Sequence, residues 1–137
     1  MAETAQRVER LAMEAVLAAE RALGYEPADV SRENRGYDIE SHHPPDPQAP
    51  LRFIEVKGRI QGAPTVTLTR NELLCALNKQ AQWILALVQV PPSDAVGEAP
   101  VVRYVAAHHV ARDPGFAAVG VNLDLDRLWE VGYPPTP

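Results

Sequence analysis

Long hydrophobic runs are missing from this chain of 137 residues, and so is an excess of positive charge. Its apolar stretches are too short or too interrupted to span a membrane, and residues 1–7 are polar and partly acidic, unlike a signal peptide. The single cysteine, Cys75, leaves no pair for an internal disulfide, which is usual in reducing compartments. These absences predict a cytoplasmic protein that does not associate with a membrane.

The shortage of basic residues limits the class of protein. Thirteen Lys and Arg stand against eighteen Asp and Glu, for a formal net charge of −5. A freestanding protein that binds nucleic acid tightly draws most of its affinity from basic side chains that neutralise phosphates, so this balance argues against one. It does not exclude a nuclease with a tethered partner, because the carboxylates of a metal site add to the negative count.

Length and composition favour one compact domain. A chain of this size can bury a core of its own but is short for two, so we predict a single domain over residues 1–137. Hydrophobic residues make up 46% and charged residues 23%, which is ordinary globular usage. Prolines concentrate in residues 44–50, 91–100 and 134–137, and these stretches are predicted to be connections.

Hydrophobic periodicity predicts the order helix, three strands, helix, strand. Residues 5–23 repeat apolar side chains at helical spacing, and Gly24 is a natural stop. Residues 25–35 read as a polar link. The three strands are expected to form a meander, and a capping box at residues 69–72 is expected to begin the second helix. The three strands of the meander are predicted at residues 36–41, 51–58 and 65–68, and the second helix at 73–79. Further strands are predicted at 83–90 and 101–106, and a short strand and helical turn within 119–131.

The most informative segment is Phe-Ile-Glu-Val-Lys-Gly at residues 53–58, which places an acid and an amine two positions apart in an apolar strand. Side chains alternate along a strand, so Glu55 and Lys57 share one face. Asp38, expected within the preceding strand, would meet Glu55 if the two strands pair as a hairpin. Two carboxylates and a lysine would then converge, a set that can hold a divalent cation and activate water for phosphodiester hydrolysis.

Plainer interpretations stand beside this one. Glu55 and Lys57 could be an ordinary ion pair on a solvated strand, worth at most about 1 kcal/mol. The motif Thr-Arg-Asn-Glu at residues 69–72 is favoured as a helix cap over a substrate contact by Arg70 or Asn71.

The motifs at residues 36–41, 54–59 and 67–72, taken in this order, resemble those of the PD-(D/E)xK nuclease superfamily. The resemblance is closer to one branch, an uncharacterised domain family named after the C-terminal region of the plant NO VEIN protein. Domains of that family also occur at the ends of bacterial Swi/Snf-type helicases, in restriction and anti-phage systems. The similarity extends roughly over residues 9–128 and implies a restriction-endonuclease-like α/β fold, in which helices flank a mixed central β-sheet with an α-β-β-β-α-β core.

The resemblance also implies roles for single residues. Asp38 and Glu55 correspond to the carboxylates that bind Mg²⁺ or Mn²⁺, and Lys57 to the residue that orients the attacking water. Many members add a glutamate from the first helix; Glu14 is the first choice for it, and Glu20 the second. Tyr37 stands where the superfamily pattern has proline.

The expected function is that of a magnesium-dependent nuclease, or of the nuclease-like module of a defence, restriction or DNA-processing system. Its expected partners are nucleic acid, DNA in the first place, and a helicase encoded with it or fused to it. One alternative is a catalytically inactive module that binds nucleic acid or docks a helicase. Another is a purely structural interaction domain, because a fold alone does not establish activity. Cation binding distinguishes the nuclease from both alternatives.

Overall fold

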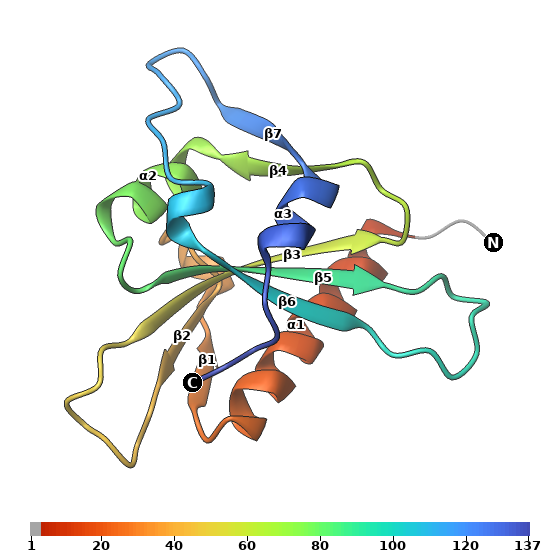
Figure 1. Cartoon of the computed structure of the whole chain (residues 1–137), viewed down its shortest axis with the longest axis horizontal. Helices are drawn as coiled ribbons and strands as arrows, with labels where there is room; N and C mark the ends of the chain where they lie inside the picture. Colours follow the sequence, from red (N-terminus) through yellow and green to blue (C-terminus); the bar gives the residue numbers. More distant parts are fainter. Residues whose placement is uncertain (1–3) are drawn as a thin grey trace.

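The computed structural model describes residues 4–137, which form a five-stranded sheet in the order β1-β2-β3-β5-β6 and a two-stranded sheet of β4 and β7 (Figure 1). The helices are α1 (Ala5–Ala22), α2 (Arg70–Asn78) and α3 (Leu125–Val131), with 3-10 turns η1 (Ser31–Glu33) and η2 (Ala107–His109). The strands are β1 (Glu26–Asp29), β2 (Ile39–His42), β3 (Arg52–Ile60), β4 (Thr65–Thr69), β5 (Trp83–Val90), β6 (Val101–Ala106) and β7 (Gly120–Asp124).

The five-stranded sheet is mixed, as the family resemblance implied. Strands β1, β2 and β3 pair antiparallel, β3 and β5 pair parallel from Phe53 opposite Trp83 to Ile60 opposite Val90, and β6 returns antiparallel to β5. β5 is buried along most of its length. Its nearly continuous apolar sequence is what a strand covered on both faces needs. The α/β fold class is therefore confirmed.

The predicted three-stranded meander is wrong at its third strand. β4 does not pair with β3 but leaves the main sheet and pairs antiparallel with β7. Its alternation explains why this is possible: Val66 and Leu68 are buried and the threonines are exposed, so one side of β4 covers the core while the other faces solvent. The place beside β3 is taken by β5, whose side chains are mostly buried.

Residues 25–35 also differ from the prediction of a polar link, because they contain β1 and η1. β1 is a four-residue edge strand with the sequence Glu-Pro-Ala-Asp and three of its residues are exposed. A strand this polar carries no alternation of apolar residues that a sequence could display.

Two layers of apolar side chains pack on the two faces of the sheet. On one face α1 contributes Ala12 and Val16 against Ile54 of β3. On the other face Phe53 of β3 packs with α2, β4 and β7, and Figure 1 shows these elements on the side opposite α1. Alternate residues of β3 therefore face different layers, and Phe53 and Lys57 face the layer that contains α2.

Close contact between α1 and β3 depends on Gly58. A Cβ atom at this position would lie 2.6 Å from Ala12 Cβ and 3.0 Å from the carbonyl oxygen of Val8. The first distance is shorter than a Cβ atom tolerates and the second is unusually tight, so α1 can lie this near to β3 because residue 58 has no side chain.

The outer strands of the sheet are short or partly covered. β1 includes Pro27, which has no N–H to offer a further strand. Along β6, Tyr104 and Tyr133 exchange two backbone hydrogen bonds of 2.8 and 2.9 Å. Within residues 4–137 no helix combines the length and the apolar character that crossing a membrane would need.

Candidate functional site

Asp38 lies one residue before β2, not within a strand as the sequence predicted. Its backbone N–H donates to the carbonyl oxygen of Ile54 at 2.9 Å, and its side-chain Oδ2 accepts the N–H of Val56 at 2.8 Å. The carboxylate thus takes the position that a strand carbonyl would occupy in a longer hairpin. Gly36, whose carbonyl oxygen accepts the Trp83 indole N–H at 3.0 Å, holds the chain that leads to it.

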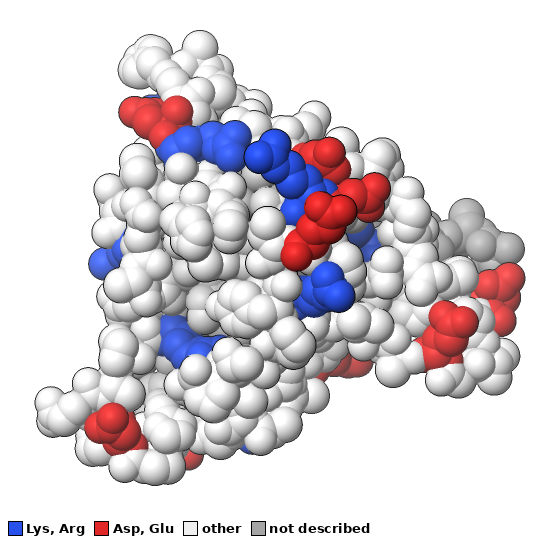
Figure 2. Space-filling view, in the orientation of Figure 1, with Lys and Arg blue, Asp and Glu red and all other residues white. Residues whose placement is uncertain are grey.

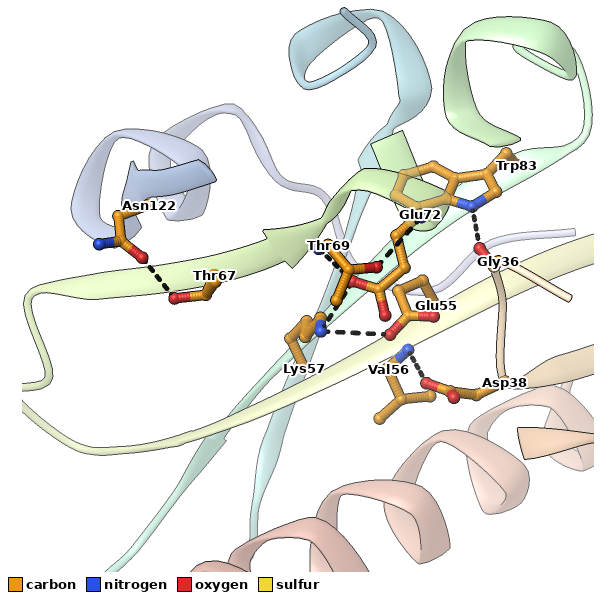
Figure 3. A network of polar contacts seen from close by, with 10 residues as sticks. All are labelled: Gly36, Asp38, Glu55, Val56, Lys57, Thr67, Thr69, Glu72, Trp83 and Asn122. Atoms are coloured by element: carbon orange, nitrogen blue, oxygen red, sulfur yellow. Dashed lines mark hydrogen bonds and ion pairs between the residues drawn. The ribbon is translucent and has the colours of Figure 1, made fainter. Parts of the chain in front are cut away.

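Glu55 and Lys57 share one face of β3, as their spacing predicted. Lys57 Nζ lies 3.5 Å from Glu55 Oε2, and Figure 3 shows the two side chains side by side above the Asp38 carboxylate. The Glu55 side chain is 4% exposed and that of Lys57 is 21% exposed. This burial contradicts the plainer interpretation of an ordinary ion pair on a solvated strand.

Glu72 is a further charged residue at the site, and its part there was not predicted. Its Oε1 lies 2.9 Å from Lys57 Nζ, closer than any oxygen of Glu55. The same oxygen accepts the N–H of Thr69 at 2.8 Å, while Thr69 Oγ1 accepts the N–H of Glu72 at 3.2 Å, which completes the predicted capping box. The sequence motif indicated the cap. The contact with Lys57 depends on the tertiary fold, in which α2 follows β4 directly and its first turn lies against β3.

One open cleft of about 760 Å³ brings these groups together, because Asp38, Glu55, Lys57 and Glu72 all line it. α1 forms the opposite wall. Glu14 of α1 also lines the cleft, with its side chain 60% exposed and 3.4 Å from Arg10. Glu20, the second choice on α1, is not among the lining residues.

Burial and like charges govern the protonation of the carboxylates. Burial, and then the negative charges of Asp38 and Glu72, raise the pKa of Glu55 well above its usual range, and Lys57 only partly opposes them. Burial also raises the pKa of Asp38, although the hydrogen bond from Val56 acts in the other direction. Six carboxylates line the cleft against two basic side chains, Arg10 and Lys57, so its lining is predominantly acidic.

Lys57 stays an ammonium in this setting. Burial disfavours its charged form, but the carboxylates of Glu55 and Glu72 outweigh burial and raise its pKa. A lysine with a raised pKa does not act as a base near neutral pH. It can donate hydrogen bonds and stabilise negative charge on a bound group.

The donor set suits Mg²⁺ or Mn²⁺. Among residues 4–137, no three His, Cys, Asp or Glu side chains are grouped as a ready-made metal cage. Mg²⁺ does not need one, since it is usually bound through one or two carboxylates while water and substrate phosphates fill its other positions. Asp38 and Glu55 offer hard oxygen ligands in a cleft with surplus negative charge, so these residues fit the ion.

The mixed sheet, with an acid before β2 and an acid and lysine on β3, defines a nuclease-like fold of the restriction-endonuclease type. The fold is similar to that of Hjc, a Holliday junction resolvase from the archaeal hyperthermophile Archaeoglobus fulgidus, with a TM-score of 0.57 and 14% sequence identity. The similarity covers 93% of this chain and 91% of that one. At this identity the likeness shows the fold.

The sequence places the chain within one family of this class. The profile described as "Protein NO VEIN, C-terminal" matches residues 8–105, well over half of the chain, and the protein belongs to that family. No curated protein matches the chain. The resemblance to the NO VEIN family is therefore confirmed by the profile match, and the nuclease-like fold is shared with the resolvase.

Proposed function

We propose that this protein is a nuclease, or the nuclease module of a larger assembly, that hydrolyses phosphodiester bonds with Mg²⁺ or Mn²⁺. The observation that carries the proposal is the convergence of Asp38, Glu55 and Lys57 in one open cleft with surplus negative charge. The fold shared with a Holliday junction resolvase supports it, because that protein acts on DNA.

Each group has a distinct part in this proposal. Asp38 and Glu55 would hold the ion, which when bound lowers the pKa of water and offsets charge on the phosphate. The Val56 N–H fixes the direction of the Asp38 carboxylate. Lys57, as an ammonium, orients the attacking water and stabilises the charge that develops on the phosphate oxygens. Glu14 is proposed as the carboxylate that α1 adds from the opposite wall.

DNA is the proposed substrate, and a partner is needed to hold it. The net charge is −5, and on the face seen in Figure 2 basic side chains are scattered among acidic ones without forming a continuous basic surface. Such a surface neutralises few phosphates, so affinity for DNA should be low and fall steeply with salt. A helicase, fused or encoded nearby in a cytoplasmic defence, restriction or DNA-processing system, would supply the grip.

A second candidate is a catalytically inactive module that binds nucleic acid or docks a helicase. The observation in its favour is that Lys57 is already held by two carboxylates, at 2.9 and 3.5 Å. An ammonium neutralised within the protein has less charge to offer a phosphate. The two candidates differ in whether the cleft binds a cation and whether bound nucleic acid is cut.

Cleavage assays test the proposal, with end-labelled duplex DNA, single-stranded DNA and RNA at low salt, Mg²⁺ or Mn²⁺, and a helicase partner. We expect the parent to cut DNA, and Glu55→Gln and Lys57→Ala to lose roughly 10²-fold or more in rate. Calorimetry should show Mn²⁺ binding by the parent and its loss in Asp38→Asn.

Glu33→Gln is the matched control, because Glu33 is an exposed carboxylate paired with Arg35 outside the cleft. It should bind Mn²⁺ and cut like the parent. If the parent cuts neither DNA nor RNA under these conditions, the enzymatic proposal is wrong, and Mn²⁺ binding without cleavage would favour the docking module.

A further inference from the structure

Lys57 lies between two carboxylates that come from different elements. Glu55 belongs to β3, like Lys57 itself, whereas Glu72 belongs to the first turn of α2. The shorter contact is the one to Glu72, at 2.9 Å against 3.5 Å for Glu55. All three side chains are at least partly buried, so solvent weakens these contacts less than it would on an open surface.

The carboxylate of Glu72 is held in place independently of Lys57. Its Oε1 accepts the N–H of Thr69, and its own N–H donates to Thr69 Oγ1. Arg70, the first residue of α2, donates its N–H to the carbonyl oxygen of Val119 at 2.9 Å. This bond ties the start of α2 to the residue before β7. Contacts other than the one to Lys57 therefore fix the position of the Glu72 carboxylate.

A divalent cation bound by Glu55 would compete with Lys57, because both are positive and Lys57 already lies 3.5 Å from that carboxylate. If Glu55 were the sole acid near Lys57, binding of the cation would have to displace the ammonium. Glu72 offers the ammonium a second partner, so that Glu55 can turn to the cation while Lys57 stays in the cleft.

We propose that Glu72 is a positioning residue that retains Lys57 and leaves Glu55 free to bind the cation. The inference rests on the proposed function, since it takes Glu55 as a cation ligand. It gives the helix cap a second purpose, because the glutamate in the first turn of α2 also fixes the lysine of the site.

A double-mutant cycle on Mn²⁺ affinity, measured by calorimetry, tests this inference without relying on activity. Glu72→Gln should weaken Mn²⁺ binding on the order of tenfold, because Lys57 then pairs with Glu55 alone. In a Lys57→Met background, which keeps an unbranched side chain without the charge, the same Glu72→Gln change should weaken binding by no more than about twofold. An equal loss in both backgrounds would mean that Glu72 acts through its own charge, and would overturn the inference.

Two further variants separate the contact from the cap and from the charge. Glu72→Asp keeps the charge but cannot reach Lys57 in the same way, so it should also weaken Mn²⁺ binding; an unchanged affinity contradicts a positioning role.

Thr69→Ala removes the hydroxyl of the cap and leaves the Glu72 carboxylate beside Lys57, so it should lower the melting temperature and keep the parent affinity for Mn²⁺. Loss of affinity in Thr69→Ala equal to that in Glu72→Gln would assign the effect to the cap.

The results also distinguish this inference from the proposed function. A parent that binds Mn²⁺, shows the expected cycle and cuts no nucleic acid refutes the nuclease and retains the role of Glu72. A parent that cuts DNA but shows equal losses of Mn²⁺ affinity in both backgrounds supports the nuclease and refutes the positioning role of Glu72. A parent that binds no Mn²⁺ overturns both.

Discussion

Glu20 is a residue whose surroundings assign it to the fold. Its side chain is fully buried, and its Oε2 accepts hydrogen bonds from Arg52 Nη2 at 2.9 Å and from the Tyr104 hydroxyl at 2.7 Å. A buried carboxylate needs such partners, because an unpaired one costs several kcal/mol. Burial, and then the hydrogen bond and negative charge of Glu20, raise the pKa of Tyr104 above its usual 10.0.

This network predicts a loss of stability in alkali. The folded protein holds the Tyr104 proton more tightly than the unfolded chain, so the contribution is fully present below pH 10 and is lost as pH rises above it. Urea unfolding between pH 8 and 11 should show the free energy of unfolding falling with pH, less steeply in Tyr104→Phe. Tyr133→Phe is the control and should fall like the parent; an equal slope in all three proteins would contradict the prediction.

Single residues of the site could be predicted where the alternation of side chains along a strand fixes the face on which they lie. The two-residue spacing put Glu55 and Lys57 on one face, and the hairpin placed Asp38 near Glu55 even though the strand begins one residue later. Glu72 could not be placed in the same way. Its motif explains a local hydrogen bond, and no local pattern reports that a residue fifteen positions from Lys57 lies against it. The catalytic parts proposed for Asp38, Glu55, Lys57 and Glu14 stay predictions.

At the scale of elements, the distance between α1 and β3 is set by a missing side chain. Gly58→Ala would place a methyl group 2.6 Å from Ala12 Cβ, so α1 or β3 must shift. We expect a loss of about 1–3 kcal/mol in the free energy of unfolding, measured in urea. Because α1 is one wall of the cleft, the shift should also alter Mn²⁺ affinity.

A compensating change checks the cause. Ala12→Gly removes the atom that the new methyl group would meet, although glycine within a helix costs about 1 kcal/mol. The double variant Gly58→Ala with Ala12→Gly should therefore be more stable than the sum of the two single losses allows. Strict additivity would show that the crowding of α1 is not the reason for the loss.

Elements with a strong period were predicted well, and their partners less well. α1 and β5 appear within a few residues of their predicted bounds, because eighteen residues of amphipathic spacing and eight of nearly continuous apolar sequence leave little choice. The alternation of β4 predicted a strand, but alternation does not say which strand it will join. Its partner β7 lies fifty residues further along the chain, where pairing is decided by packing of the whole core.

At the scale of the whole molecule, the family resemblance implied the mixed sheet that the structure shows, and the charge balance argued against tight binding of nucleic acid by this chain alone. The cleft adds to this picture, because its carboxylates outnumber its one lysine. DNA would therefore meet a negative cleft until a divalent cation is bound. Cation binding and substrate binding should be coupled, a property that arises from the arrangement of side chains and cannot be inferred from a net charge.

The exchange of hydrogen bonds between Tyr104 and Tyr133 has a consequence for how copies of the protein behave in concentrated solution. An open strand edge can pair with the same edge of another molecule, which begins aggregation. β1 resists this through Pro27 and its short length, and Tyr133 occupies part of the edge of β6. Removal of residues 132–137 should leave β6 free to pair with other chains, and static light scattering at rising concentration should detect stronger self-association than in the parent. Equal scattering by both would mean that Tyr133 is not what keeps neighbouring molecules apart.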